Sequence, residues 1–177
     1  MTVIILVGLA RSGKDTAADY LVQKHGFTKY TFSDVLKELL EQKGITSTKK
    51  RMNELGDILR NEMGMAAIAK MLDKKINKKD KLVFVGPRSI EEIDYFKKKF
   101  PELKIIKITT GKDERFGRRS EEDPSEKEEF HKRDEDDKYN KGFQKVLDSA
   151  DFQVNNFSEI ENFYSELETV LNLVQSE

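Results

Sequence analysis

The chain has 177 residues, with 32 Lys and Arg against 33 Asp and Glu, so its net charge is −1 at pH 7. This balance excludes a global electrostatic attraction to nucleic acid or anionic membranes, and neither is an expected partner. No cysteine and only two histidines are present, which excludes disulfides, thiolate metal sites and a histidine-based metal centre. The length fits one domain, 1–177, and the apolar start is too short to span a bilayer and lacks a basic leader. We therefore expect a cytoplasmic protein without a membrane span.

Short apolar runs alternate with longer amphipathic segments along the chain. The apolar runs predict five strands, at residues 3–7, 27–32, 81–86, 103–109 and 151–155. The amphipathic segments predict helices at residues 14–25, 33–42, 89–100 and from 158 onward, with one or two more in 48–76 interrupted around Gly64. Because the strands are apolar throughout, we expect an α/β fold in which helices cover both faces of a parallel sheet.

Several residues mark where these helices begin and end. Gly26 is placed to end the first helix. SIEE (89–92) and SEIE (158–161) both have the spacing of a capping box, in which a serine and a glutamate satisfy each other's backbone N–H groups. The last helix carries an apolar stripe formed by Ile160, Phe163, Leu167, Val170, Leu171 and Val174.

Residues 111–142 break this alternation, because they contain almost no core residues and read as too charged to pack. A connection of this length is usually a functional lid or a disordered segment. The alternative is a solvated pair of charged helices. Composition alone does not separate these readings.

The stretch GLARSGKDT (8–16) follows the first predicted strand and has the spacing of a phosphate-binding loop, or P-loop. Glycines at both ends of such a loop let backbone N–H groups turn toward a phosphate, and its lysine reaches the β- and γ-phosphates. We therefore expect ATP to bind here. The predicted contacts are Gly8, Ala10, Arg11, Ser12, Gly13, Lys14, Asp15 and Thr16.

Asp15 stands where such loops normally carry a serine or threonine that touches Mg²⁺. The strand that would supply a supporting carboxylate ends in Val85 and Gly86 and has no acid. Our hypothesis is that Asp15, with Thr16 beside it, takes over support of the metal. The alternative is that Asp15 only caps the helix and interacts with its dipole.

The chain resembles P-loop proteins of the nucleoside monophosphate kinase type, and more closely an archaeal group described as adenylate-kinase-related or dephospho-coenzyme-A-kinase-like. The shared stretches are the loop itself, GPRSIEEIDYF (86–96), ERFGRRSEEDP (114–124), EFHKRDED (129–136) and ADFQVNNFSEIE (150–161). The resemblance implies a three-layer P-loop NTPase fold, with a five-stranded parallel sheet flanked by helices, an acceptor-binding helical region at 33–80 and a short arginine-rich lid at 111–142.

The resemblance also assigns residues to the acceptor pocket. SDVLK (33–37) is similar to an adenylate-kinase segment that lines this pocket, which implies roles for Asp34 and for Lys37 in place of an arginine. GPR (86–88) is similar to a segment whose arginine grips the acceptor phosphate, here Arg88. Arg51 and Arg60 could line the pocket or coat a helix, and we favour the pocket.

In the lid, the resemblance implies that Arg115 stacks on the donor base and that Arg118 or Arg119 meets the donor phosphates. It also implies that Arg133 closes over the transferring phosphoryl group. The stretch NNF (155–157) is similar to the loop that contacts the donor adenine, which implicates Asn155 and Asn156. The residues expected to act in catalysis are thus Lys14, Arg88, Arg118, Arg119 and Arg133.

These features predict a kinase that moves the γ-phosphate of ATP, with Mg²⁺, to a small-molecule nucleotide acceptor, either AMP or a deoxynucleotide. A monophosphate acceptor is already ionised near neutral pH and needs no general base. One alternative is a kinase of a hydroxyl group, such as that of dephospho-coenzyme A, with Asp34 as the base. Another is a nucleotide-responsive regulatory protein with slow ATPase activity.

Overall fold

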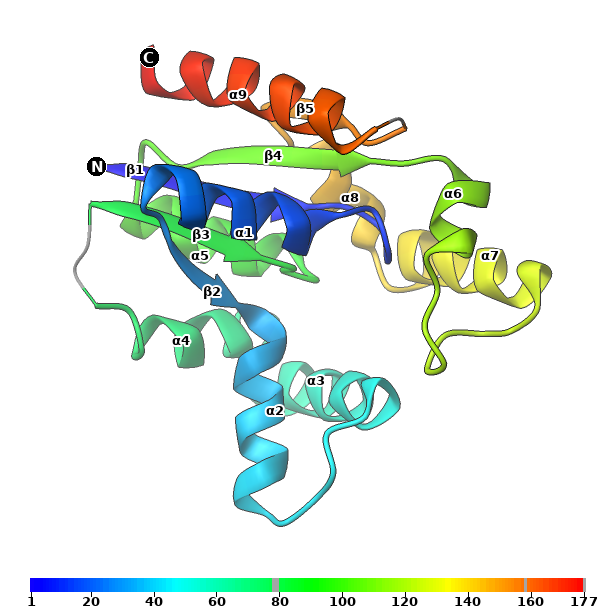
Figure 1. Cartoon of the computed structure of the whole chain (residues 1–177). Coiled ribbons are helices and arrows are strands. Elements are labelled where there is room, and N and C mark those ends of the chain that lie inside the picture. The colour runs from blue at the N-terminus through cyan, green and yellow to red at the C-terminus, as the bar shows by residue number, and fades with distance from the viewer. Residues whose placement is uncertain (78–79, 158, 177) are drawn as a thin grey trace.

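The computed structural model describes residues 1–77, 80–157 and 159–176 and is built on a parallel five-stranded sheet (Figure 1). The strands are β1 (Thr2–Val7), β2 (Thr28–Thr31), β3 (Lys81–Val85), β4 (Lys104–Thr109) and β5 (Phe152–Asn155). Their order in the sheet is β2-β3-β1-β4-β5, and every pair is parallel. The predicted five-stranded parallel sheet flanked by helices is confirmed.

Strand β1 lies at the centre of the sheet, where its side chains are buried on both faces. Ile5 is opposite Phe84 of β3 on one side and Ile105 of β4 on the other. All five residues from Val3 to Val7 are at most 2% exposed. A strand with this double burial must be apolar throughout, which explains the uninterrupted run VIILV.

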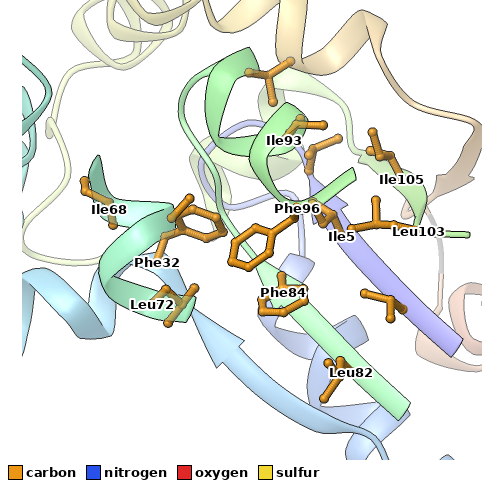
Figure 2. Packing of buried hydrophobic residues seen from close by; sticks show 14 of the residues in the cluster. Ile5, Phe32, Ile68, Leu72, Leu82, Phe84, Ile93, Phe96, Leu103 and Ile105 are labelled. Atoms are coloured by element: carbon orange, nitrogen blue, oxygen red, sulfur yellow. The ribbon is translucent and has the colours of Figure 1, made fainter. Parts of the chain in front are cut away.

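Helices cover both faces of the sheet and form two cores. Ile4 and Leu6 face the core under α1 (Lys14–His25) and α9 (Ile160–Ser176). On the other face, Ile5 and Phe84 belong to the core that Figure 2 shows, which includes Phe96. The helices over this second face are α2 (Phe32–Gln42), α4 (Ala67–Asp73), α5 (Ile90–Lys99) and α8 (Phe143–Asp148).

The helix boundaries agree with most of the sequence signals. Gly26 ends α1 in a left-handed conformation with φ 70°. The capping box of α5 is present, because Ser89 Oγ accepts from the Glu92 N–H at 3.2 Å and Glu92 Oε2 accepts from the Ser89 N–H at 3.3 Å. The second predicted box includes Ser158, which lies outside the described residues. The α9 stripe is buried except at Ile160, which is 42% exposed.

The chain after β2 first projects away from the sheet and then returns to it with α4 (Figure 1). Of the one or two helices predicted for residues 48–76, two form, α3 (Lys49–Met63) and α4, and Gly64 separates them with a φ of 92°. Thr48 caps α3 by accepting a hydrogen bond from the Arg51 N–H at 3.3 Å. No helix among the described residues is long and apolar enough to cross a membrane.

The charged segment 111–142 folds into α6 (Lys112–Gly117), α7 (Lys127–Glu135) and the π-helix η1 (Asp136–Asn140). The prediction that it is too charged to pack is wrong. Phe130 is 0% exposed and meets the Phe116 ring edge-on at 5.6 Å. Arg115 donates to Asp134 at 2.6 Å, and both side chains are almost fully buried. Arg115 and Asp134 can be buried because they pair with each other, whereas most other side chains of α6 and α7 are exposed, as a solvated helix pair predicts.

Candidate functional site

The loop between β1 and α1 has a conformation that only glycine can adopt at its two ends. Gly13 has a φ of 102°, and a Cβ there would lie 2.4 Å from Asn156 Nδ2. A Cβ on Gly8 would lie 2.5 Å from the carbonyl oxygen of Ile108. Asn156 also donates from Nδ2 to the Ser12 carbonyl at 2.9 Å, which ties the loop to the segment after β5. The backbone is therefore held in the turned form that phosphate binding requires.

Lys14 lies at the first position of α1 and folds back over the loop. Its Nζ donates to the carbonyls of Gly8 at 2.8 Å and Leu9 at 2.9 Å. Burial and the nearby Arg88 lower the pKa of Lys14 from 10.5 to about 8, although Asp15 acts in the opposite direction. The ammonium group is thus surrounded by other cations and is suited to an anionic ligand.

A cavity of about 1050 Å³ opens beside the loop and extends to α3 and the lid segment. Eight cationic side chains line it: Arg11, Lys14, Lys49, Arg60, Arg88, Arg118, Arg133 and Lys141. Four carboxylates line it as well: Asp15, Asp57, Asp123 and Asp137. The cavity wall therefore carries an excess of four positive charges in a chain whose net charge is −1.

Most of the residues expected at the site line this cavity. They are Ala10, Arg11, Gly13, Lys14, Asp15, Thr16, Arg60, Arg88, Arg118, Arg133 and Asn156. Gly8 lines a small adjoining cavity of about 160 Å³, and Ser12 is buried in the loop beneath. The remaining expected residues, Arg115, Arg119, Asn155, Asp34, Lys37 and Arg51, are not in the cavity wall.

Three residues expected in the acceptor pocket lie outside it. Asp34 and Lys37 are exposed on α2, where Lys37 Nζ lies 3.9 Å from Glu41. Arg51 is exposed and donates to the Thr46 carbonyl at 3.1 Å. The structure thus corrects the acceptor roles implied for Asp34, Lys37 and Arg51, because their side chains point to solvent.

Arg60 is in the cavity wall but its charge is already paired. Its Nη2 lies 2.9 Å from Glu92 Oε1, and the two side chains are 9% and 0% exposed. Glu92 also accepts the Arg88 N–H at 2.7 Å. Burial raises the pKa of Glu92 above its ordinary value, although Arg60 and the backbone donors act to lower it. Arg60 therefore anchors α3 to α5, and the reading that it coats a helix surface is wrong.

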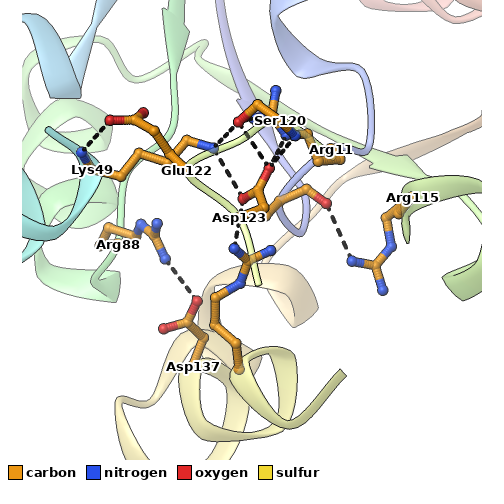
Figure 3. A network of polar contacts seen from close by, with 10 residues as sticks. Arg11, Lys49, Arg88, Arg115, Ser120, Glu122, Asp123 and Asp137 are labelled. Carbon is orange, nitrogen blue, oxygen red and sulfur yellow. Dashed lines mark hydrogen bonds and ion pairs between the residues drawn. The ribbon is translucent and has the colours of Figure 1, made fainter. Parts of the chain in front are cut away.

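Arg88 follows β3 and faces the cavity from the carboxyl edge of the sheet. Its Nη1 donates to Asp137 at 3.1 Å, and its guanidinium lies 5.7 Å from the centre of the Phe143 ring. Figure 3 shows this pair beside the larger polar network of the lid. Arg88 is therefore placed where ligands bind in parallel sheets of this kind.

The lid arginines have three different environments. Arg115 is 2% exposed and donates to Asp134 and to the Ala10 carbonyl, so its guanidinium is not on the cavity wall where a donor base would stack. Arg119 is exposed and lies over the Phe116 ring at 4.1 Å. Arg118 faces the cavity and donates to the Asn156 carbonyl at 3.3 Å. Of these three arginines, only Arg118 is placed to meet a ligand.

Asn155 and Asn156 follow β5 and have separate structural partners. Asn155 donates from Nδ2 to Glu166 at 2.9 Å and accepts from Thr109 Oγ1 at 2.8 Å. Asn156 is 6% exposed and holds the phosphate loop through the Ser12 carbonyl. The side chain of Asn155 thus fixes the strand end, while Asn156 borders the cavity.

Asp123, which the sequence did not predict as a site residue, is the centre of the polar network in Figure 3. Its carboxylate accepts from Arg11 Nε at 2.7 Å, Lys49 Nζ at 3.0 Å and Arg133 Nη1 at 2.7 Å. Burial acts to raise its pKa, but the Ser120 N–H and these three cations hold it well below its usual range. Asp123 belongs to the ERFGRRSEEDP stretch, where only the arginines were given roles, and no local pattern distinguishes it from the neighbouring acids.

A polar face of α3 was missed as well. Asn53, Asp57 and Asn61 are spaced by four residues, so they share one side of the helix, and all three line the cavity. Phe32 and Leu36 of α2 complete this end of the cavity with apolar surface. The regular spacing of the three polar residues was readable from the sequence.

Asp15 and Thr16 line the cavity next to the phosphate loop. Oxygen ligands of this type suit Mg²⁺, so the residues fit that ion. Asp15 Oδ1 also lies 2.9 Å from Lys29 Nζ, and this ammonium competes for the same carboxylate. Among residues 1–77, 80–157 and 159–176, no three carboxylates or histidines form a metal-binding cluster of their own.

Comparison with protein families and curated proteins gives matches over most of the chain. A family described as an AAA domain matches residues 7–138. The UPF0200 protein of Pyrococcus abyssi is 30% identical over 97% of this chain and 96% of its own length. A UPF0200/UPF0201 protein of Archaeoglobus fulgidus is 31% identical over 97% of this chain, which corresponds to 55% of that longer protein.

Solved structures show the same fold at low sequence identity. A shikimate kinase from Bacteroides thetaiotaomicron has a TM-score of 0.65 and 14% identity, with 98% of each chain covered. A gluconokinase from Sinorhizobium meliloti 1021 has a TM-score of 0.52 and 14% identity, with 99% of this chain and 94% of that chain covered. These likenesses show the α/β P-loop kinase fold alone.

Proposed function

Because the chain belongs both to the P-loop kinase-like family described as an AAA domain and to the archaeal UPF0200 proteins, we propose that it transfers the γ-phosphate of ATP to a nucleoside monophosphate. The acceptor in this proposal is AMP or a deoxynucleotide, and the cofactor is Mg²⁺. The proposal thus includes an acceptor of the adenylate-kinase type, and the cavity described above supports it.

The charge of the cavity wall is the observation that carries this proposal. ATP with its magnesium ion brings a charge of about −2, and a nucleoside monophosphate brings about −2 more near neutral pH. Arg60 is paired with Glu92 outside the wall, so of the excess of four positive charges about three remain for ligands. ATP with its magnesium ion would leave about one of these unneutralised, so the charge favours a second phosphorylated ligand.

The residues of the chain supply position and positive charge, which is what phosphoryl transfer chiefly requires. Lys14 and the N-terminus of α1 bind the phosphates of the donor. Arg88 holds the acceptor phosphate from the end of β3, and Arg118 and Arg133 lie on the lid side of the same cavity. When bound, Mg²⁺ neutralises charge that develops on the transferred group. No proton need be removed from an ionised phosphate acceptor.

A kinase of a hydroxyl group, such as that of dephospho-coenzyme A, is a second candidate because Asp57 lies in the cavity wall. A hydroxyl acceptor needs a general base, and Asp34 is exposed and outside the cavity. Asp15, Asp123 and Asp137 are each paired with a cation, whereas Asp57 has no hydrogen bond or ion pair with another described residue. Asp57 is therefore the base that this second function would use.

A coupled assay with ATP, Mg²⁺ and a panel of nucleoside monophosphates, dephospho-coenzyme A and simple polyols tests the proposal. Turnover with monophosphates alone is the expected result. Turnover only with an alcohol would favour the second candidate. Tight ATP binding without transfer to any acceptor would instead indicate a nucleotide-responsive protein and contradict both kinase readings.

Asp57→Asn distinguishes the two kinase functions through the separate kinetic constants. If Asp57 only accepts hydrogen bonds from the acceptor, KM for the acceptor should rise about tenfold or more with kcat nearly unchanged. If Asp57 is a general base, kcat should instead fall by about 10²–10⁴-fold. Asp34→Asn is the matched control, because Asp34 is an exposed carboxylate outside the cavity. We expect the first result for Asp57→Asn and no change for the control.

Asp15→Asn tests whether this carboxylate supports the metal. The Mg²⁺ concentration for half-maximal activity should rise about tenfold, because one anionic oxygen near the ion is lost. Lys29→Met should have the opposite effect, since it frees Asp15 from the ammonium 2.9 Å away. An unchanged Mg²⁺ requirement in both variants would contradict metal support by Asp15. The role of Asp15 would then be its interaction with the helix dipole, which contributes about 0.3–1 kcal/mol of stability.

A further inference from the structure

Asp123 lies in the turn before α7 and is surrounded by donors. Its side chain is 1% exposed and accepts from the Ser120 N–H at 2.9 Å and from Ser120 Oγ at 3.2 Å. The three cations around it, Arg11, Lys49 and Arg133, lie within 3.0 Å of its oxygens. One carboxylate thus neutralises about one of three positive charges and leaves about two for a ligand.

The three cations come from three separate parts of the chain. Arg11 belongs to the phosphate loop, Lys49 begins α3 in the acceptor-binding region, and Arg133 lies on α7 of the lid. Arg11 is the one described residue other than glycine with a positive φ, 65°, so its backbone is held in an uncommon conformation. Asp123 therefore joins the donor side, the acceptor side and the lid at one point.

Arg133 has donors that the protein itself does not use. Its Nη1 binds Asp123, while its Nε and Nη2 are buried and have no partner among the described residues. The guanidinium is held over the Phe130 ring at 4.5 Å. A buried donor without a partner is unfavourable, and an anion at this position would satisfy it.

The lid segment also has internal contacts that do not involve Asp123. Phe116 and Phe130 pack against each other, and Arg115 pairs with Asp134, all within the segment 111–142. Apart from Arg133 and Ser120, the partners of Asp123 lie in other parts of the molecule. Its role is therefore to place the lid relative to the phosphate loop and α3.

We propose that Asp123 is a positioning residue that holds Arg11 and Arg133 against the phosphoryl groups and fastens the lid to the first turn of α3 through Lys49. The part of this inference that concerns phosphoryl groups rests on the proposed function. The carboxylate of Asp123 lies among the three cations. The N–H groups of these cations that do not bind Asp123 bind the phosphates of the ligand.

Asp123→Asn is the test variant, because it keeps the shape of the side chain and removes its charge. We expect kcat to fall about 10–100-fold with a smaller change in KM for ATP, since the arginines lose their alignment but the phosphate loop remains. Asp123→Glu should recover part of kcat by restoring the charge. Asp113→Asn is the matched control: Asp113 is also a lid carboxylate, paired with Lys127 at 2.8 Å, and is 73% exposed. It should leave kcat unchanged.

A distance measurement tests the same inference without activity. The chain has no cysteine, so Lys50→Cys and Glu128→Cys place two spin labels on α3 and α7 without further changes. The labelled protein and its Asp113→Asn form should give one narrow distance distribution by pulsed electron paramagnetic resonance. The Asp123→Asn form should give a broad distribution that extends to longer distances.

The two experiments separate failure of this inference from failure of the proposed function. An unchanged distance distribution and an unchanged kcat in Asp123→Asn would overturn the role of Asp123 while leaving the kinase intact. A broadened distribution in Asp123→Asn, in a protein that transfers phosphate to no acceptor, would support the positioning role and overturn the kinase proposal instead.

Discussion

Replacing Arg60 by methionine should lower the free energy of unfolding by about 3–5 kcal/mol, measured by urea denaturation at neutral pH. The substitution leaves the 0% exposed carboxyl of Glu92 without its cationic partner. An uncompensated buried charge is far more costly than the loss of a surface ion pair. A loss below about 1 kcal/mol would mean that solvent reaches Glu92 and would contradict its burial.

The same variant should show a characteristic pH dependence. Burial already raises the pKa of Glu92, and loss of Arg60 raises it further because Arg60 acts to lower it. A carboxyl with a raised pKa binds its proton more tightly in the folded state, so it favours folding increasingly as the pH falls through that pKa. The deficit of Arg60→Met should therefore shrink between neutral pH and the unfolded value of 4.5. Adding Glu92→Gln, which removes the charge, should reduce the deficit at neutral pH.

Replacing Lys14 by methionine should weaken ATP binding about 10–150-fold and reduce kcat by about 10²–10³-fold. The first effect is the loss of a charged hydrogen bond to phosphate, and the second is the loss of charge stabilisation during transfer. Isothermal titration calorimetry measures the first and the coupled assay the second. The fold should be unaffected, since Lys14 Nζ bonds only carbonyls of its own loop.

Lys14→Arg is the control variant that keeps the positive charge. Its ATP affinity should depend on pH differently from that of the native protein. Because the pKa of Lys14 is about 8, its ammonium is charged below that value and loses its proton above it. ATP affinity of the native protein should therefore fall as the pH rises through about 8, by up to tenfold per unit. Lys14→Arg remains charged and should show no such fall. A native affinity that stays constant to about pH 10 would contradict the lowered pKa.

The fold could be predicted from local patterns because a strand that is buried on both faces must be apolar along its whole length. VIILV and LVFVG contain only apolar residues and glycine, and both became central strands. The capping box at Ser89 and the glycine at position 26 act through their nearest neighbours, so they could also be predicted. The burial of Phe130 could not, because it depends on how the whole lid segment folds around one aromatic ring.

The candidate site was predictable only in part. The phosphate loop is a continuous stretch whose glycines have one conformational explanation, and Lys14 and Arg88 were placed in the cavity as expected. The resemblance assigned Asp34 and Lys37 to the acceptor pocket, although the helical period of α2 argues against that assignment. The buried residues of α2 occupy one side of the helix, so positions 34 and 37 must face away from it. The four-residue spacing of polar residues on α3 was the better guide to that end of the cavity.

The triple ion pair at Asp123 could not be predicted from spacing, because its members are up to 112 positions apart. Nothing in a charged run tells which acid will be buried among cations from other elements. Such a contact is decided by tertiary packing alone.

The ion pairs that hold the two ends of α3 differ greatly in their exposure to solvent. Near its C-terminal end Arg60 is 9% exposed in its pair with Glu92, whereas Lys49 at the first turn is 37% exposed in its pair with Asp123. Water can replace the partner of Lys49 at much lower cost than that of Arg60. Rotation of α3 is therefore expected to pivot near Arg60 and to open the gap between its first turn and the lid.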